Sequence, residues 1–371
     1  MEIINARSPK FYTISAPGLV SAELKLSIWN GNFNQKTPTP NYILNKKGIN
    51  STATFEVAEL ISDFIDVQFN GIYSSQGVWV NAEITSFDIA GGILSATTTT
   101  ELAFNSYTYF EEPNAVFPIL AMSNREVFLL DGETFNLPVF VDGENRLIQV
   151  LKNGVVLFEQ TLIPSDNSSD KIQYVIVGDF KNSYADRVVA DGGTLESENC
   201  LSVFDDIFNG VDVIKITGEK GEAIKVRNIS ECKFEPKKIT FVNKFGSLQD
   251  MFFFKKSVEK IDIKKESYRA NTIDAFGVYD TSQHTQRDFN ITADESITLN
   301  SGYLSEEYNE VFKQLMLSEK VWLTNYLDGD DQVIPVNVKS KGITYKTSVN
   351  DRLVDYAIEF ENSFNVINNI R

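Results

Sequence analysis

The feature that most constrains the fold is the recurrence of short runs in which apolar and polar side chains alternate. In the run 23–29, Leu24, Leu26 and Ile28 occupy alternate positions and therefore share one face of an extended strand. Similar runs recur along the chain between glycine, asparagine and proline residues, which favour turns. This pattern predicts a mainly β protein.

Two pairs of these runs are joined by residues that favour tight turns. Asn153-Gly154 links 147–152 to 155–159, and this dipeptide is typical of a type I′ hairpin, whose central residues need positive φ. A second hairpin is expected between 211–217 and 223–226. Short strands at this spacing favour β-sandwich domains of immunoglobulin or fibronectin type.

Two stretches have the period of a helix instead. In 57–65 the apolar residues recur at helical spacing and share one stripe: Val57, Leu60, Ile61, Phe64 and Ile65. The second predicted helix covers 305–318. Ser305 is its expected N-cap, and its apolar stripe consists of Tyr308, Val311, Phe312 and Leu315.

The 371 residues suggest more than one domain, and the charge is unevenly spread over them. Residues 126–235 hold 20 acidic and 10 basic residues, far more excess charge than the segments on either side. Prolines lie near both ends of this segment. We therefore expect an N-terminal β domain at 1–125 with one short helix, an acidic β-sandwich domain at 126–235, and a C-terminal β domain at 236–371 that packs the 305–318 helix.

The net charge of −17 excludes several partners. A strongly negative chain is repelled by phosphate backbones, so no sequence-specific nucleic-acid binding is expected. No apolar run approaches the ~20 residues of a membrane helix, so no membrane partner is expected. The start of the sequence lacks the apolar stretch of a signal peptide, so secretion is not indicated.

The chain has one histidine and two cysteines, which limits its catalytic chemistry. His284 is the only residue able to serve as a histidine base, and no nucleophile motif accompanies it. Cys200, Cys232 and His284 supply three ligands, whereas a structural zinc site needs four. The two cysteines are either a disulfide or, as we favour, buried thiols. We expect no metal and no cofactor.

Acidic clusters offer two further readings. Asp328, Asp330 and Asp331 could hold calcium, but the spacing fits a hairpin turn better than an EF-hand. A glycosidase pair could be drawn from several carboxylates, but solvated faces explain these far better: Asp205, Asp206, Asp212, Glu111 and Glu112. The sequence therefore predicts a protein that is not an enzyme.

A dense basic run is the candidate subunit interface. Its candidate residues are Lys255, Lys256, Lys260, Lys264 and Lys265, with Phe252 and Phe254 beside them. A basic edge of this kind could face the acidic middle segment of a neighbouring copy. The alternatives are a plain solvated face or a surface for nucleic acid.

The segment 239–254 reads Ile-Thr-Phe-Val-Asn-Lys-Phe-Gly-Ser-Leu-Gln-Asp-Met-Phe-Phe-Phe. It resembles a hairpin of virion proteins from tailed phages of Bacteroidetes, including the crAss-like phages. The segments 26–31, 57–65 and 298–323 are similar to the same group. The resemblance implies a tail-tube-like C-terminal domain in a neck, tail-tube or baseplate subunit.

The resemblance implies a non-enzymatic virion protein, made in the bacterial host cytoplasm. Its expected partners are copies of itself in a closed ring, sixfold or twelvefold, and other phage neck or tail proteins. The alternative is a tail-associated adhesin that binds a host glycan, for which Trp29, Trp79 and Trp322 could stack on sugars. Core packing is the competing explanation of these tryptophans.

Overall fold

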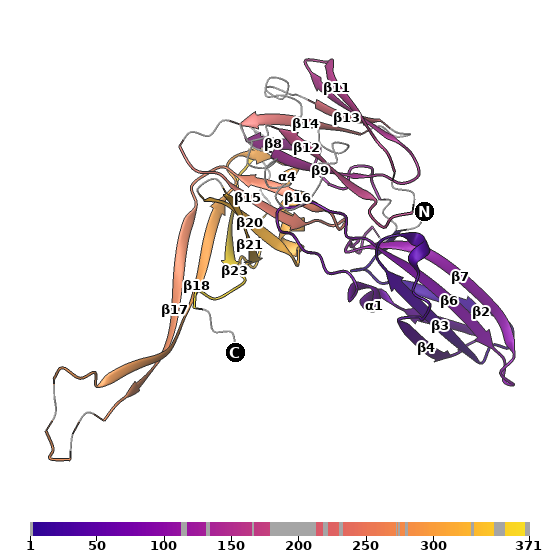
Figure 1. The fold of residues 1–371 in the computed structure, drawn as a ribbon, viewed down its shortest axis with the longest axis horizontal. Coiled ribbons are helices and arrows are strands. Elements are labelled where there is room, and N and C mark those ends of the chain that lie inside the picture. Colours follow the sequence, from indigo (N-terminus) through magenta and orange to yellow (C-terminus); the bar gives the residue numbers. More distant parts are fainter. Residues whose placement is uncertain are drawn as a thin grey trace.

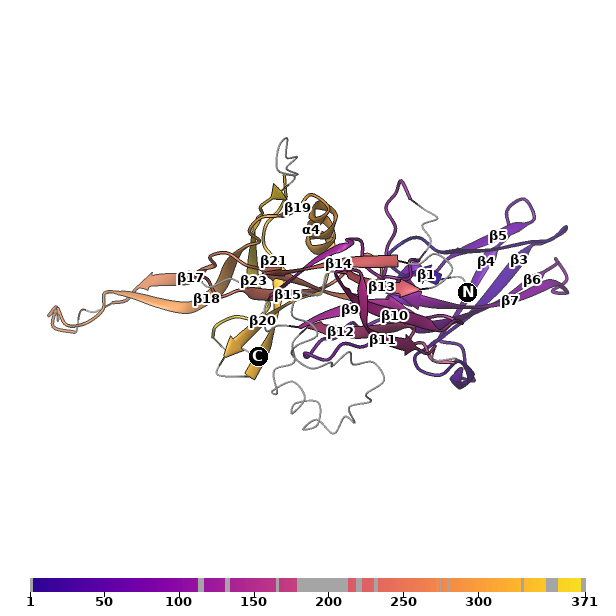
Figure 2. The same cartoon turned by 90° about the horizontal axis from the view of Figure 1, so that it is seen from above.

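A computed structural model shows that the chain is mainly β, as predicted. It describes residues 3–112, 117–130, 134–164, 167–178, 213–217, 222–229, 233–271, 273, 275–278, 281–327, 330–344 and 353–367. The molecule is elongated, with an N-terminal sheet at one end and a thin two-stranded arm at the other (Figures 1 and 2). Within these ranges no helix is long and apolar enough to cross a membrane.

The N-terminal part is a five-stranded sheet of order β1-β7-β6-β3-β4, with the pair β2–β5 beside it. The strands are β1 (Ile3–Asn5), β2 (Phe11–Ser15), β3 (Ser21–Trp29), β4 (Tyr42–Lys47), β5 (Thr52–Glu56), β6 (Val78–Phe87) and β7 (Ile93–Phe104). A 3-10 turn (Phe33–Gln35) and the helix α1 (Ala58–Ser62) lie in the connections. The predicted helix at 57–65 is thus a single short turn.

The middle part contains a five-stranded sheet of order β11-β10-β13-β14-β8 and the pair β12–β9. Its strands are β8 (Glu126–Leu130), β9 (Thr134–Phe140), β10 (Arg146–Lys152), β11 (Val155–Leu162), β12 (Ile172–Gly178), β13 (Val213–Thr217) and β14 (Glu222–Ile229). Both predicted hairpins are confirmed, because β10 pairs antiparallel with β11 and β13 with β14.

The C-terminal part is a seven-stranded sheet of order β16-β15-β20-β21-β23-β18-β17. Its strands are β15 (Lys237–Val242), β16 (Leu248–Phe253), β17 (Val258–Arg269), β18 (Gln286–Asn300), β20 (Val321–Leu327), β21 (Asp330–Val338) and β23 (Ala357–Asn362). The helix α4 (Tyr308–Leu317) follows β19 (Leu304–Ser305), which pairs with β22 (Leu353–Val354).

The helix α4 confirms the predicted apolar stripe but not the predicted N-cap. Tyr308, Val311, Phe312 and Leu315 are all buried. Ser305 instead pairs with Leu353 in the small sheet, so the helix begins three residues later. The N-cap is Glu307, whose side chain makes no capping hydrogen bond.

The hydrophobic core does not divide at the boundary expected near 236. One cluster of buried side chains joins the middle and C-terminal parts, including Phe135, Ile148 and Ile214 from the former and Phe241, Phe312 and Phe360 from the latter. The N-terminal cluster likewise includes Tyr174, Val242 and Trp322. The two cores therefore draw on distant segments, and the three-domain division stays a prediction.

A buried carboxylate connects all three parts of the chain. Asp250 on β16 accepts hydrogen bonds from the hydroxyls of Tyr73 (2.5 Å) and Thr240 (2.8 Å). It also accepts from the backbone and side-chain nitrogens of Asn136, each at 3.2 Å. Tyr174 lies near it, and burial raises the pKa of the Tyr174 hydroxyl well above its usual range. Four donors from three regions thus meet one acidic group.

The Asn153-Gly154 turn provides a test of the hairpin. Both residues have positive φ, 51° and 79°, and a Cβ added at Gly154 would meet nothing within 4 Å. Gly154→Val should therefore act through backbone strain alone and lower the free energy of unfolding by about 1–3 kcal/mol. Gly154→Asn is the matched control, because asparagine tolerates this conformation. Equal denaturant midpoints for the two variants would contradict this account of the turn.

The buried carboxylate provides a second test. Asp250→Ala removes the acceptor from four donors, so the free energy of unfolding should fall by roughly 3 kcal/mol or more. The control is Glu259→Ala, which removes an exposed carboxylate and should change it by less than about 0.5 kcal/mol. Chemical denaturation measures both. An Asp250→Ala chain as stable as the control would show that the contacts of Asp250 contribute nothing net.

Candidate functional site: a projecting arm

The most distinctive feature of the surface is the arm formed by β17 and β18. The two strands pair antiparallel from Val258–Thr298 out to Arg269–Gln286. On the body side, β23 pairs with β18 only from Ser296 to Asn300. Beyond that point the arm is a two-stranded ribbon that extends away from the body (Figures 1 and 2). An isolated ribbon of this kind is only marginally stable in water.

The sequence of the arm explains its regular ladder and its bend. β17 alternates charged and apolar residues, with Ile261 and Ile263 between Lys260, Asp262 and Lys264. β18 carries one extra residue where the register shifts between Lys264 and Glu266. The extra residue lies at Asn290, whose φ of 50° suits asparagine. The bulge is therefore encoded locally and leaves β17 regular.

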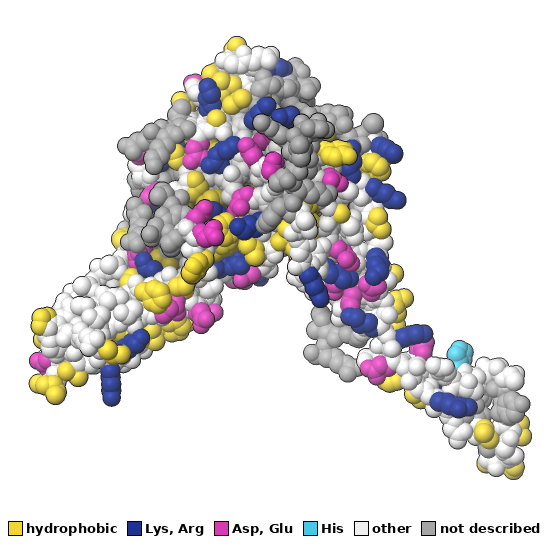
Figure 3. Space-filling model, turned by 180° about the vertical axis from the view of Figure 1, so that it is seen from behind, with side chains coloured by type: hydrophobic (Ala, Val, Ile, Leu, Met, Phe, Trp, Pro, Cys, Tyr) yellow, Lys and Arg dark blue, Asp and Glu magenta, His cyan; other side chains and the backbone are white. Residues whose placement is uncertain are grey.

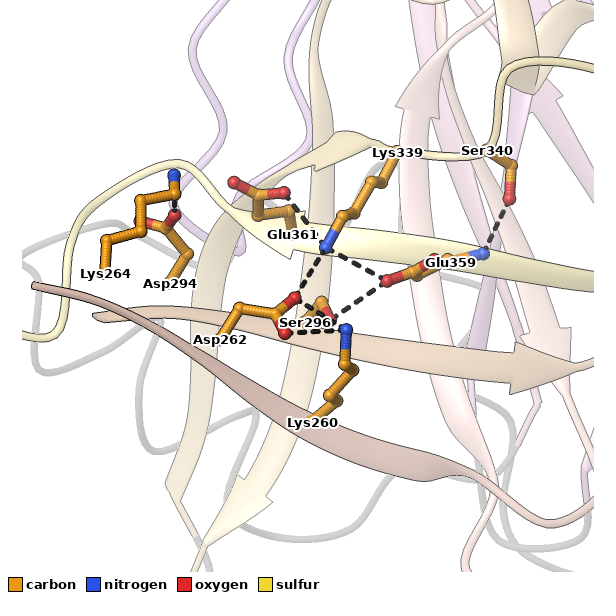
Figure 4. Close-up of polar contacts among 9 residues, drawn as sticks. All are labelled: Lys260, Asp262, Lys264, Asp294, Ser296, Lys339, Ser340, Glu359 and Glu361. Carbon is orange, nitrogen blue, oxygen red and sulfur yellow. Dashed lines mark hydrogen bonds and ion pairs between the residues drawn. The ribbon is translucent and has the colours of Figure 1, made fainter. Parts of the chain in front are cut away.

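One face of the arm root carries a network of ion pairs (Figure 4). The ammonium of Lys339, just after β21, lies 3.1 Å from Glu359, 3.3 Å from Asp262 and 3.5 Å from Glu361. Lys260 Nζ lies 2.6 Å from Asp262. Further out, Lys264 Nζ lies 2.5 Å from Asp294. These pairs tie the first half of β17 to β18, β23 and the end of β21.

The network shifts the pKa values of its members in the directions that ion pairing requires. The hydrogen bond to Glu359 raises the pKa of Lys339, and the hydrogen bond from Lys339 lowers the pKa of Glu359. Lys260 and then Lys339 lower the pKa of Asp262, and Asp294 raises that of Lys264. All of these groups lie at the surface, so salt screens the pairs and each contributes little to stability.

The opposite face of the arm carries exposed apolar side chains among charged ones. Ile261 and Ile263 are 52% and 62% exposed. At the root, this face opens into a groove of about 420 Å³, whose lining includes Ile261 and Ile297 together with Glu259 and Glu295. Ile297 lies opposite the buried Phe360, so the groove continues the core face of the seven-stranded sheet. Exposed apolar side chains thus continue from this edge of the core onto the arm.

The far end of the arm also exposes apolar side chains. Phe276 is 91% exposed, and Ile273 and Val278 are exposed beside it. Tyr268 and Phe289 make an edge-to-face contact across the ribbon, with ring centroids 5.6 Å apart. Figure 3 shows apolar side chains in yellow at this end. Exposed apolar residues that gather on one element mark an interaction site.

The lysines of the basic run lie at the surface, but the structure does not give them the positively charged surface that the sequence predicts. Lys260, Lys264 and Lys265 do lie on the exposed arm, but each pairs with a carboxylate of the same hairpin. The segment 258–300 as a whole holds 8 acidic and 5 basic residues. The run is therefore basic along the sequence but not on the surface, because the pairing of β17 with β18 places acidic residues beside it.

The remaining candidates of that interface lie nearer the body. Lys256 is exposed, whereas Lys255 is partly buried in the connection that follows β16. Phe252 and Phe254 are 4% and 3% exposed and belong to the shared core. Phe254 packs against Phe128, and Phe252 stacks on Phe254, so little area of either ring is exposed for an interface.

The structure separates the other candidate residues. His284 is exposed on the arm (Figure 3). Glu111 and Glu112 border a separate cleft of about 520 Å³ with Lys244 and Arg125. Several candidates lie outside the described residues: Cys200, Cys232, Asp205, Asp206, Asp212 and Asp328. Among the residues described, no group of three or more histidine, cysteine and acidic side chains could hold a metal ion.

The tryptophans are core residues. Trp29, Trp79 and Trp322 are all buried. The indole nitrogens of Trp29 and Trp79 donate to the backbone carbonyls of Asn32 and Gly31. Core packing therefore explains all three rings, and none of them offers a face to a sugar.

No protein-family model matches this chain, and no curated protein matches it either.

The ion-pair network predicts a measurable response at the arm root. Lys339→Met should raise the pKa values of Glu359 and Asp262, because their charged forms lose a cationic hydrogen-bond donor. Lys341→Met is the matched control, since Lys341 lies two residues away and its side chain is exposed. Carboxyl-carbon NMR titrations measure both. Unchanged pKa values in Lys339→Met would show that the network does not persist in solution.

Proposed function

We propose that the chain is a non-enzymatic structural subunit of a bacteriophage virion that assembles into a ring in the neck or tail. The observation that carries an assembly role is the arm, which projects from the body and exposes apolar residues along one face and at its end. A secreted or cytosolic monomer gains nothing from such an element, whereas a subunit buries it against a neighbour.

The phage context rests on the resemblance of 239–254 and the segments similar to the same group. The structure gives this stretch a physical role, because β15 carries Thr240 and β16 carries Asp250, the buried carboxylate to which Thr240 donates a hydrogen bond. Gly246 in the turn between them has φ 75°, and an added Cβ would lie 3.1 Å from the backbone of Asn105. The turn therefore requires glycine, both for its conformation and for its close contact with the N-terminal part.

We also propose that the middle part is a β-sandwich of immunoglobulin or fibronectin type. Buried residues from the two sheets contribute to one core: Leu137, Val139, Val175 and Val177 from β9 and β12, with Ile148, Val150, Ile214 and Ile224 from β10, β13 and β14. Two sheets that bury their inner faces against each other are the defining feature of a sandwich.

The same proposal includes a closed ring of six or twelve copies, other neck or tail proteins as neighbours, and the virion as the location of the protein. The competing role as a glycan-binding adhesin loses its main support, since the three tryptophans are buried. Candidate glycan-binding aromatics would have to be exposed, and among the described residues of the arm the most exposed aromatic side chain is Phe276.

Negative-stain microscopy of the purified chain tests this function. The parent chain should form closed rings, and mass spectrometry of purified virions should detect it. An arm-shortened variant, in which a two-residue Asn-Gly turn joins Lys264 to Thr292, is the matched control. We expect it to keep the thermal midpoint of the body but to form far fewer assemblies. A virion that lacks the protein would contradict the phage role, and full assembly without the arm would contradict the role of the arm.

A further inference from the structure

The outer edge of β17 is a long row of backbone groups without a neighbouring strand. In the described part of the chain, β17 is the last strand of the seven-stranded sheet and pairs only with β18. It runs for 12 residues, and all but Asp262 are exposed. A long exposed edge is a ready template for another strand, and proteins usually protect it with charged side chains, prolines, bulges or short length. β17 is long and has no proline, and the bulge lies on β18, so its charged side chains are its protection against strands with the wrong charge pattern.

The charges of β17 are arranged symmetrically about Ile263. Lys260 and Asp262 precede it, whereas Lys264 and Glu266 follow it. In an antiparallel pair, residues directly opposite each other share a face, and opposite charges there stabilise the pair. If β17 is paired with a second β17 so that Ile263 faces itself, Asp262 faces Lys264 and Lys260 faces Glu266. Each pair occurs twice because of the symmetry.

We propose that two copies of this chain pair through the outer edges of β17, antiparallel and about a two-fold axis at Ile263. The contact is self-complementary, as a two-fold interface must be. On one face it alternates opposite charges and ends with Val258 opposite Tyr268. On the other face it brings together the two copies of Ile263, which is 62% exposed in a single chain.

The neighbouring registers place like charges opposite each other, so the sequence of β17 favours the register centred on Ile263. A shift that centres the pair on Asp262 places Lys260 opposite Lys264 and Asp262 opposite itself. A shift that centres it on Lys264 places Asp262 opposite Glu266 and Lys264 opposite itself. Like charges directly opposite destabilise a strand pair. An odd shift would place the outward backbone groups of one β17 opposite inward groups of the other, so the hydrogen-bond ladder could not form.

The pairing also accounts for the apolar end of the arm. Antiparallel strands place the tip of one arm beside the root of the other, so Phe276 of each copy approaches the body of its partner. The inference rests on the proposed function only in treating the chain as an assembling subunit. A two-fold contact does not close a ring of more than two copies, so in a ring it would join copies of two facing rings.

Disulfide trapping tests the axis. In a Cys200→Ser, Cys232→Ser background, Ile263→Cys places two thiols opposite each other, at Cα distances of about 4.5–5.5 Å. Ile261→Cys is the matched control, because the same residue type on the same face lies four positions, about 13 Å, from its own copy. We expect a covalent dimer on oxidation for Ile263→Cys and little for Ile261→Cys. Equal trapping at both positions, or none at Ile263→Cys, would overturn the register.

Charge exchange tests the same contact in the native background. Lys260→Glu places like charges opposite each other twice per dimer and should weaken dimerisation roughly three- to tenfold, measured by sedimentation velocity. The double variant Lys260→Glu, Glu266→Lys restores opposite charges and should recover most of the affinity. A parent chain that stays monomeric, or a double variant no better than Lys260→Glu, would overturn the proposal.

The outcomes separate this inference from the proposed function. Rings that form without trapping at Ile263→Cys would leave the ring subunit standing and overturn the β17 pairing. Trapped dimers in preparations that never form rings would support the pairing and count against the ring.

Discussion

The architecture depends on one buried carboxylate. Asp250 gathers donors from Tyr73, Asn136 and Thr240, which belong to three segments far apart in the sequence. A buried acidic group without such donors would be strongly unfavourable, so the three segments must be in place together. The aromatic contact of Phe69 with Trp322 and the position of Tyr174 over Leu248 reinforce the same junction. The body can then act as one rigid support for the arm.

The arm differs from the body because it leaves apolar side chains and a strand edge exposed. Its charged face is satisfied within the chain by Lys339 and its carboxylate neighbours. No described strand pairs with the outer edge of β17, and Ile261 and Ile263 are exposed. The β17–β18 ladder holds the two strands in register, and the exposed apolar side chains lie along this ladder.

Local patterns in the sequence were sufficient to predict the strands, both hairpins and the buried stripe of α4, since each depends on periodicity or turn chemistry within a few residues. The start of α4 was missed because Ser305 pairs with Leu353, a contact that no local pattern reveals. The sequence predicts the charges of the basic run but not the charge of the surface, because Asp288 and Asp294 lie beside the lysines only once β17 and β18 pair. The burial of Phe252 and Phe254 is not predictable from local patterns, because it depends on the long-range contact of Phe254 with Phe128 and on the stacking of Phe252 on Phe254.

The shared core has a consequence for the order in which the chain can fold during synthesis. Most of the N-terminal core comes from residues before 105, so this part can collapse while the ribosome is still adding the rest. The middle strands are different, because Phe312 and Phe360, which complete their core, are made much later. Until these residues are made, the strands that begin at β8 expose apolar surface. Contacts of such long sequence separation also form slowly. The nascent chain is therefore most vulnerable to aggregation or to chaperone capture in the interval between β14 and β23.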